Sequence, residues 1–495
     1  MGDGDGRDAT GHPTYTVVVI GAGISGILVG IKLLEARITS FVILEKAADL
    51  GGTWRDNTYP GVSCDVATHL YVYSFAPNPS WRSRFTDGDK ILDYYRRVAG
   101  KCGIDRFIRF NEEVTHAKWT GSSWQVDTST GRTLEAAIVI TAVGRLHRPK
   151  FPEIPGLEDF GGPVLHTAQW DHAVATAGKR VGLIGNGSSG TQLTVALARW
   201  VAQLSIFQRT PQWVLPVPNE AIRWRTRLAL RLIPGRARKN YTTLQRGTEE
   251  RGVAAMGTKA QRQSRDHMCY DALATVRDPE LRRKLTPDYE PGCKRMVISE
   301  RFYEAVQEPT VHVITDGIDH VEKGTVITRD GARHDLDVLV LATGFHAQAF
   351  LHPMRVEGED GIELDEVWRH TAMNYRSVAI PHMPNFFMIN GPYSPGGSAS
   401  VVGIAEAQVG FVMQLVAESL GRAVTLSPRP DRAALLLDEV RASAKATVWG
   451  TGGCTSWYLD DEGVPTINPI PLSVLQRQMA KPDFEDFIVV PVRRH

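Results

Sequence analysis

The distribution of apolar residues predicts two strand–turn–helix units in one chain. The β-branched run Tyr15–Ile20 is followed by a glycine-rich turn and then by the apolar stretch Ile24–Leu34. Val181–Ile184 is followed in the same way by Thr191–Val201. Short apolar runs bounded by glycine are typical of buried parallel strands, and the longer apolar stretches indicate helices. We therefore expect two βαβ openings.

Both turns carry the GxGxxG pattern, as GAGISG and GNGSSG. The pattern is informative only between a strand and a helix, and both copies have that context. Such a turn brings the backbone close to a pyrophosphate and aims free N–H groups of the helix N-terminus at it. The residues predicted to bind dinucleotides here are Gly21, Gly23, Ile24, Ser25, Gly26, Gly185, Gly187, Ser188, Ser189, Gly190 and Gln192.

The strand that follows each turn separates the two ligands. FVILEK ends with Glu45 and Lys46, and a carboxylate at this place accepts hydrogen bonds from ribose hydroxyls. SIFQRTP ends instead with Arg209 and Thr210, and a guanidinium there clamps the 2′-phosphate of NADPH. We predict that the first unit binds FAD and the second NADPH. The alternative is a pair of solvated charges at strand ends.

Length and composition indicate an ordinary multidomain protein. The chain has 495 residues, and a single core stops growing at about 250 to 300 residues. Apolar content of 42%, charged content of 22% and a net charge of +1 give no reason to expect nucleic acid as a partner. No CxxC pair occurs, so we expect no metal site and reduced thiols at the five cysteines, which are Cys64, Cys102, Cys269, Cys293 and Cys454.

The N-terminal region could be mistaken for a targeting or membrane segment. Tyr15–Leu34 is apolar, but it contains the glycine turn, Ser25 and Lys32. Met1–Pro13 lacks the basic start and apolar core of a signal peptide. We expect a disordered leader over residues 1–13, a cytoplasmic location and no membrane partner.

The pattern along the chain places the second unit inside the first. Leu336–Phe345 contains a β-branched strand followed by Ala-Thr-Gly, and we predict that this segment returns the chain to the FAD domain. Ile138–Gly144 is an earlier, similar segment at which the chain leaves that domain. The predicted fold class is α/β, with two Rossmann-like dinucleotide-binding domains and a helical insert. The expected boundaries are residues 14–148 and 341–495 for the FAD domain, 149–212 and 293–340 for the NADPH domain, and 213–292 for the insert.

The insert is strongly basic, and its arginines are interleaved with apolar residues. A membrane-surface helix is one interpretation, with Trp224, Leu228, Leu230, Leu232 and Ile233 on its apolar face. Pro234-Gly235 ends that helix early, which favours a solvated helical insert covering the active-site cleft.

Two longer motifs resemble a known family. GGTWRDNTYPGVSCD at Gly51–Asp65 and FGGPVLHTAQWD at Phe160–Asp171 resemble the fingerprints of type I Baeyer–Villiger monooxygenases, a group of class B flavoprotein monooxygenases. Flavin-containing monooxygenases that oxidise amines and sulfides usually end the second motif with an aromatic and a basic residue, whereas Asp171 follows Trp170 here. The resemblance implies further cofactor-binding residues, which are Gly52, Thr53, Trp54, Tyr59, Asp65 and Tyr71. Trp54, Tyr59 and Trp170 are expected to pack rather than to contact substrate.

The resemblance also implies the catalytic residues. In DYEPGCKRM, Arg295 matches the family's active-site arginine, and Asp65 matches the carboxylate that positions it. Lys294 resembles a lysine that binds the 2′-phosphate together with Arg209. Trp457, in CTSWYLDDEG, matches a tryptophan that contacts the ribose on the nicotinamide side. His166 and Trp170 are expected on the interdomain linker, in a gating role rather than a chemical one.

The activity implied is an FAD- and NADPH-dependent Baeyer–Villiger oxidation. One oxygen atom of O2 is inserted next to a ketone carbonyl, through a C4a-peroxyflavin, to give an ester or lactone. The alternative is a flavin-containing monooxygenase that oxidises sulfur or nitrogen in small molecules; a flavin reductase and a nonenzymatic scaffold are more distant. GPYSPGGSASV and IAEAQ, within Gly391–Gln408, resemble a flavin-domain segment of the 4-hydroxyacetophenone-type branch, and the absence of a Gly-Ala-Asn-Pro-Gly-Lys segment after Trp457 argues against a close cyclohexanone-type relative. The ketone stays open, as does the choice between monomer and dimer.

Overall fold

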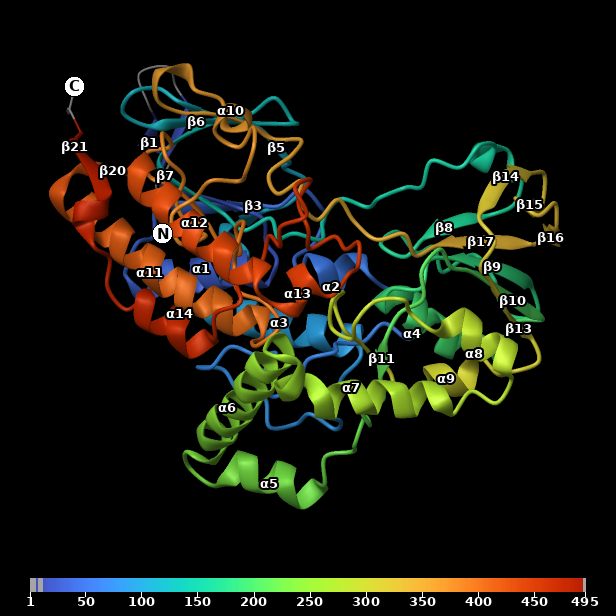
Figure 1. The fold of residues 1–495 in the computed structure, drawn as a ribbon. Coiled ribbons are helices and arrows are strands. Elements are labelled where there is room, and N and C mark those ends of the chain that lie inside the picture. Colours follow the sequence, from blue (N-terminus) through green and yellow to red (C-terminus); the bar gives the residue numbers. More distant parts are fainter. Residues whose placement is uncertain (1–5, 8–11, 493–495) are drawn as a thin grey trace.

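The computed structural model describes residues 6–7 and 12–492. Two sheets built around parallel strands stand side by side, each with helices against it, and a helical arm extends from one side (Figure 1). The nine-stranded first sheet has the order β18-β5-β6-β7-β2-β3-β4, with β1 paired to β2 and β19 paired to β7.

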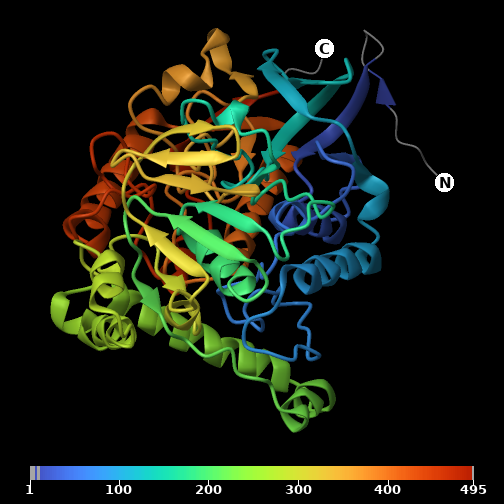
Figure 2. The same ribbon diagram turned by 90° about the vertical axis from the view of Figure 1, so that its right-hand side faces the viewer.

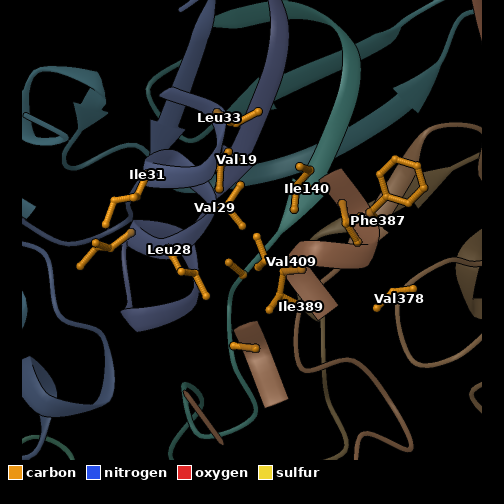
Figure 3. Packing of buried hydrophobic residues seen from close by; sticks show 14 of the residues in the cluster. Val19, Leu28, Val29, Ile31, Leu33, Ile140, Val378, Phe387, Ile389 and Val409 are labelled. Carbon is orange, nitrogen blue, oxygen red and sulfur yellow. The ribbon is translucent and has the colours of Figure 1, made fainter. Parts of the chain in front are cut away.

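The centre of the first sheet is β2 (Pro13–Ile20), which pairs in parallel with β3 (Phe41–Leu44) and β7 (Thr133–Thr141). Its last four residues are buried, as expected for a strand covered on both faces. Helix α1 (Ile24–Glu35) packs against α11 (Val401–Arg422), so the first turn and a late segment share one core. Figure 3 shows Leu28, Ile140 and Val409 meeting there.

The second sheet has five parallel strands in the order β13-β10-β9-β17-β8. Its strands are β8 (Val164–His166), β9 (Arg180–Ile184), β10 (Gln203–Phe207), β13 (Val311–Ile314) and β17 (Val338–Leu341). Helix α4 (Ser188–Leu197) follows the second glycine turn and contacts α9 (Phe302–Ala305). A small antiparallel sheet joins β14 (Ile318–Glu322), β15 (Thr325–Thr328) and β16 (Arg333–Asp335).

The strand within Leu336–Phe345 lies on the NADPH side of the boundary that we expected at residue 340. Strand β17 pairs with β8 and β9 in the second sheet, and the residues after it return to the first. Its likeness to the earlier segment Ile138–Gly144 has a steric reason. A Cβ on Gly185 would meet the Ala342 carbonyl oxygen at 2.5 Å, as one on Gly21 would meet the Ala142 carbonyl oxygen at 2.9 Å. The two similar segments therefore occupy equivalent places in two sheets.

Four helices occupy the region between β11 (Val214–Leu215) and β12 (Val297–Ile298). They are α5 (Trp224–Leu232), α6 (Arg236–Met256), α7 (Lys259–Ala274) and α8 (Pro279–Leu285). Helix α7 packs against β11 and α6, and α6 carries α5 at the outer end of the arm (Figures 1 and 2). Helix α5 lies away from both sheets, and the coverage of the active-site cleft by the insert stays a prediction.

The remaining elements extend the first sheet, form a separate two-stranded sheet, or pack around the two units. They are β4 (Ile108–Arg109), β5 (Val114–Trp119), β6 (Trp124–Thr128), β18 (Arg355–Glu357), β19 (Phe386–Met388), β20 (Val424–Pro428), β21 (Phe487–Pro491), α2 (Thr53–Asp56), α3 (Gly88–Cys102), α10 (Leu364–Val367), α12 (Pro430–Lys445), α13 (Val448–Thr451) and α14 (Leu472–Gln478).

The leader is partly ordered. Gly6–Arg7 forms β1 and pairs with Pro13 and Thr14, so the expectation of disorder over residues 1–13 is wrong at these positions. Residues 1–5 and 8–11 lie outside the described residues. Among the described helices, α11 alone is long and apolar enough to cross a membrane, but 56% of its apolar window is buried within the fold. A core helix of this kind is weak evidence for a membrane span.

Candidate active site

The first glycine turn has no room for side chains. Gly21 has φ +99°, and a Cβ on Gly26 would meet the Gly21 carbonyl oxygen at 1.8 Å. Gly52, with φ +53°, lies against the turn, since its Cβ would stand 3.2 Å from the Gly23 Cα. Thr53 starts α2 directly after it. This close approach of two glycine segments at the N-terminus of α1 is suited to a pyrophosphate.

Glu45 is placed to serve that turn. Its side chain is buried and accepts hydrogen bonds from the Ala22 N–H at 2.8 Å and the Ala47 N–H at 3.0 Å. It also accepts one from the Arg55 guanidinium at 2.8 Å. A carboxylate offers about four acceptor positions, so one is left for a ribose hydroxyl. The neighbouring Lys46 is exposed.

The turn is also braced from the C-terminal half of the chain. The Asn390 amide donates to the Ser25 hydroxyl at 3.0 Å, and the Asn390 N–H donates to the Gln408 side chain at 2.7 Å. Ile24 begins α1 beside it. The indole N–H of Trp54, in the first motif, donates to the hydroxyl of Tyr71 at 3.1 Å. Trp54 and Tyr71 thus brace each other, as packing residues do.

The second turn repeats the first. Gly185 has φ +102°, and a Cβ on Gly190 would meet the Gly185 carbonyl oxygen at 2.2 Å. A Cβ on Gly187 would face open space, so this side of the turn is accessible to a ligand. Ser188 and Ser189 form the first turn of α4. The same cradle is therefore present twice, once in each sheet.

One residue of α4 also contacts the first unit. The Gln192 side-chain oxygen accepts a hydrogen bond from the Tyr59 hydroxyl at 2.8 Å, and its amide donates to the Ser63 carbonyl at 3.0 Å. Burial raises the pKa of Tyr59 to about 12. The structure thus gives Gln192 and Tyr59 an interdomain contact.

Two cations meet beside the second turn. Burial and then the positive charge of Arg209 lower the pKa of Lys294, with Asp288 acting in the opposite direction. Arg209 is exposed, and the carbonyl of Thr210 accepts from the Asn186 amide at 3.0 Å. Adjacent cations repel each other unless an anion lies between them, so this pair is suited to a phosphate.

Arg295 and Asp65 form an ion pair that joins distant parts of the chain. Nη2 of Arg295 lies 2.5 Å from Oδ2 of Asp65, across 230 positions of sequence. The carboxylate, assisted by Tyr458, raises the pKa of the Arg295 guanidinium, so it is charged at every physiological pH. Asp65 is 21% exposed but Arg295 is 46% exposed, so part of the guanidinium stays accessible to another group.

The expectation of reduced thiols is wrong for two cysteines. Cys293 and Cys454 form a disulfide with a Cα–Cα distance of 6.0 Å. They are 161 positions apart, so only the tertiary fold brings them together and no spacing rule could indicate the pair. Cys64, Cys102 and Cys269 are free thiols. The bond ties the segment before Lys294 and Arg295 to the segment before Trp457.

A variant that removes this disulfide, Cys454→Ser, is expected to lower the free energy of unfolding by about 2 to 4 kcal/mol, because a long loop in the unfolded chain is released. Denaturant unfolding of both proteins measures the difference. The free cysteine variant Cys102→Ser is the matched control. Five titratable thiols in unreduced, denatured wild-type protein, instead of three, would contradict the disulfide.

Arg145 was not singled out by the sequence analysis. Its guanidinium lies 5.4 Å from the ring centre of Phe350 and 5.5 Å from that of Trp457. Its Nε and one Nη atom are buried without a hydrogen-bond partner among the described residues, and burial lowers its pKa to about 10. A buried cation without a carboxylate favours a bound polar or anionic group beside Trp457, which is itself 42% exposed. An isolated arginine after a strand carries no signal that sequence reasoning could use.

His166 lies beside the two segments, at Lys150 and Gly344, where the chain passes between the first and second sheets. It is the last residue of β8, rather than part of a linker, and its ring packs on Phe151 and Phe345. These two segments are hydrogen-bonded to each other, since the Lys150 N–H donates to the Gly344 carbonyl at 2.9 Å. Burial lowers the pKa of His166, and its Nδ1 accepts the Ala168 N–H at 3.1 Å. His166 is thus a packing residue between these two segments. Trp170 is half-buried in the core of the second unit.

Two Rossmann-like units, joined by the Arg295–Asp65 ion pair, are the architecture of a protein with two dinucleotide sites. Residues 14–232 match the family described as flavin-binding monooxygenase-like. The chain is 44% identical over 92% of both chains to an uncharacterized monooxygenase of Mycobacterium tuberculosis. It is 37% identical to a Baeyer–Villiger monooxygenase of Streptomyces coelicolor, over 97% of this chain and 93% of that one.

Solved structures give the same result. The structure of cyclohexanone monooxygenase from Rhodococcus sp. bound to NADP+ matches with a TM-score of 0.87 and 27% identity, over 97% of this chain and all of that one. An NADP-bound steroid monooxygenase matches with a TM-score of 0.86 and 28% identity, over 96% and 99%. The protein belongs to the flavin-binding monooxygenase family, among its Baeyer–Villiger members, and it is an FAD- and NADPH-dependent monooxygenase.

Proposed function

We propose that the Arg295–Asp65 pair is the catalytic centre at which this enzyme converts a ketone to an ester or lactone. Bound FAD supplies the redox chemistry, since it accepts a hydride from NADPH and activates O2. Arg295 holds a permanent positive charge where negative charge develops on oxygen, and one well-placed donor of this kind contributes about 3 to 4 kcal/mol. Asp65 fixes its orientation and offsets its desolvation. The observation that carries the proposal is a partly exposed arginine held by a carboxylate 230 positions away.

We assign FAD to residues 14–148 and 341–495, and NADPH to residues 149–212 and 293–340. The steric cradles at Gly21 and Gly185 and the acceptor left on Glu45 support this division. So does the paired positive charge of Arg209 and Lys294, which suits the 2′-phosphate. His166 is proposed to set the geometry of the two segments that connect the FAD and NADPH domains. It would thereby control the domain closure that excludes water from the flavin.

The substrate class proposed is an aryl ketone, as for the 4-hydroxyacetophenone-type branch. The sequence after Trp457 lacks the segment typical of the cyclohexanone-type branch, and Trp457 and Phe350 place two aromatic rings around Arg145. A panel of aryl, cyclic and steroidal ketones and one aryl sulfide tests this assignment. Higher kcat/KM for aryl ketones supports it, and a preference for cyclohexanone overturns the branch. Sulfoxide as the only product would indicate the heteroatom oxygenase instead.

Arg209→Glu is expected to raise the KM for NADPH by about tenfold or more and to leave the KM for NADH nearly unchanged. The reason is that the variant replaces a charge-assisted phosphate contact with repulsion between like charges. Steady-state oxidation of both nucleotides measures the ratio. Arg329→Glu, the same change of charge at another exposed arginine, is the control. An unchanged NADPH/NADH preference would place the phosphate clamp elsewhere.

A further inference from the structure

Helix α5 exposes an apolar stripe to solvent. Trp224, Leu228 and Leu232 are 61%, 46% and 66% exposed, and they recur every four residues along one face of the helix. Ile233, at the end of the helix, is 53% exposed. Leu230 is buried and lies on the opposite side, so α5 docks through that side and leaves the stripe uncovered. A helix that packs only for its own stability would turn its larger apolar face inward.

The stripe lies within a block of unbalanced positive charge. Residues 221–248 contain no Asp or Glu and eight basic residues, which are Arg223, Arg225, Arg227, Arg231, Arg236, Arg238, Lys239 and Arg246. No ion pair involves any of the eight in the part of the chain that the structure describes. By helical position, Arg225 flanks the stripe on one side and Arg227 and Arg231 flank it on the other. The net charge of the whole chain is only +1, so this charge is a local feature.

The position of α5 makes the stripe accessible. In Figures 1 and 2 the helix stands at the outer end of the arm formed with α6, away from both sheets. Its inner side packs on α6 and near Pro77, Pro79 and Tyr241. The stripe therefore has no role at the active-site arginine, and its chemistry is separate from that of the reaction.

We propose that α5 is an interfacial helix that docks the enzyme on an anionic lipid surface. Arginines beside an apolar stripe match this environment, because the guanidinium groups meet lipid phosphates while Trp224, Leu228 and Leu232 enter the acyl boundary. A second copy of the chain is a poorer occupant, since it would bring two uncompensated basic blocks together. A nucleic acid would use the arginines but not the stripe. The proposal replaces the expectation from the sequence that no membrane is involved.

The test is co-sedimentation of the FAD-loaded enzyme with vesicles. One set is pure phosphatidylcholine, and in the other about a third of the lipid is phosphatidylglycerol. Wild-type enzyme is expected to partition at least about tenfold more strongly onto the anionic set at low salt, and less at high salt. The triple variant Trp224→Ser/Leu228→Ser/Leu232→Ser and the double variant Arg225→Gln/Arg231→Gln are each expected to lose about tenfold or more. Trp200→Ser, which removes a tryptophan that is 71% exposed elsewhere, is the matched control.

Each outcome decides the proposal. Equal binding to both vesicle types, or none, overturns it. Unchanged binding of the triple variant also overturns it, because the arginines alone would then account for the attraction. Self-association of the wild type that the triple variant loses, without vesicle binding, assigns the stripe to a subunit interface instead. Bound flavin and NADPH oxidation, equal to those of the wild type, confirm that the variants are folded, since none of these residues lies at the active site.

Discussion

Replacement of Arg295 by alanine is expected to abolish ester formation while FAD is still reduced by NADPH. The guanidinium is the proposed fixed positive charge that stabilises negative charge on the reacting oxygen. Loss of one hydrogen-bond donor in such a role typically lowers the rate about 10²- to 10³-fold. Hydride transfer needs the two nucleotides in contact but not this charge, so reduction persists. Anaerobic stopped-flow spectra of the flavin give the reduction rate, and mass spectrometry of an aryl ketone incubation gives the ester.

Arg301→Ala is the control for this variant, because Arg301 is 50% exposed and pairs with Glu304 at the surface. Asp65→Ala is expected to reproduce part of the loss, since Arg295 then keeps its charge but not its orientation. Normal ester yield from the Arg295 variant would remove this residue from the mechanism. If both flavin reduction and ester formation are lost, Arg295 binds the nucleotide rather than stabilising charge on the reacting oxygen.

The pair Gly21→Ala and Gly185→Ala is expected to separate the two cofactors. In each variant a methyl group would meet a carbonyl oxygen, that of Ala142 at 2.9 Å and that of Ala342 at 2.5 Å, at a residue with positive φ. Backbone must move at one glycine turn in each case. We expect Gly21→Ala to be purified with little or no FAD, and Gly185→Ala to keep FAD but lose reduction by NADPH. Flavin absorbance of the purified proteins and the anaerobic reduction rate distinguish them.

Gly331→Ala provides the control for backbone strain alone. Gly331 has φ +83°, but nothing lies within 4 Å of its added Cβ. This variant is expected to lose about 1 kcal/mol of stability and to keep both cofactors. Reversed phenotypes for the two turn variants, with NADPH reduction lost first from Gly21→Ala, would contradict the assignment of FAD to the first unit.

The features readable from the sequence are those with local causes. Gly21 and Gly185 are fixed by contacts with backbone a few residues away or with one neighbouring strand, and a short apolar run before each marks the strand. Arg295 and Asp65 were indicated by motif resemblance alone, yet the structure brings their side chains together. Strand β17 lies in the second sheet, on the side of the predicted boundary at residue 340 that the sequence analysis gave it, and its likeness to β7 reflects equivalent places in two sheets.

The features that escaped prediction depend on contacts between distant segments. The Cys293–Cys454 bond needs two loops that meet only in the folded chain. In the sequence, Arg145 looks like any solvated arginine, and only the folded chain brings the rings of Phe350 and Trp457 against its guanidinium. The amphipathic pattern of α5 was visible in the sequence. Whether its stripe faces the core or solvent depends on how α5 packs against α6, which the sequence does not show.

A single turnover with labelled oxygen tests the central claim most directly. Enzyme loaded with FAD is reduced by one equivalent of NADPH without air, and ¹⁸O2 is then admitted together with an aryl ketone. The account predicts an ester that carries one ¹⁸O atom and one oxygen of the ketone, in an amount close to that of the flavin, from wild type but not from the Arg295 variant. Unlabelled or absent ester from the wild type, with hydrogen peroxide as the only product and no ketone able to suppress it, would contradict the account.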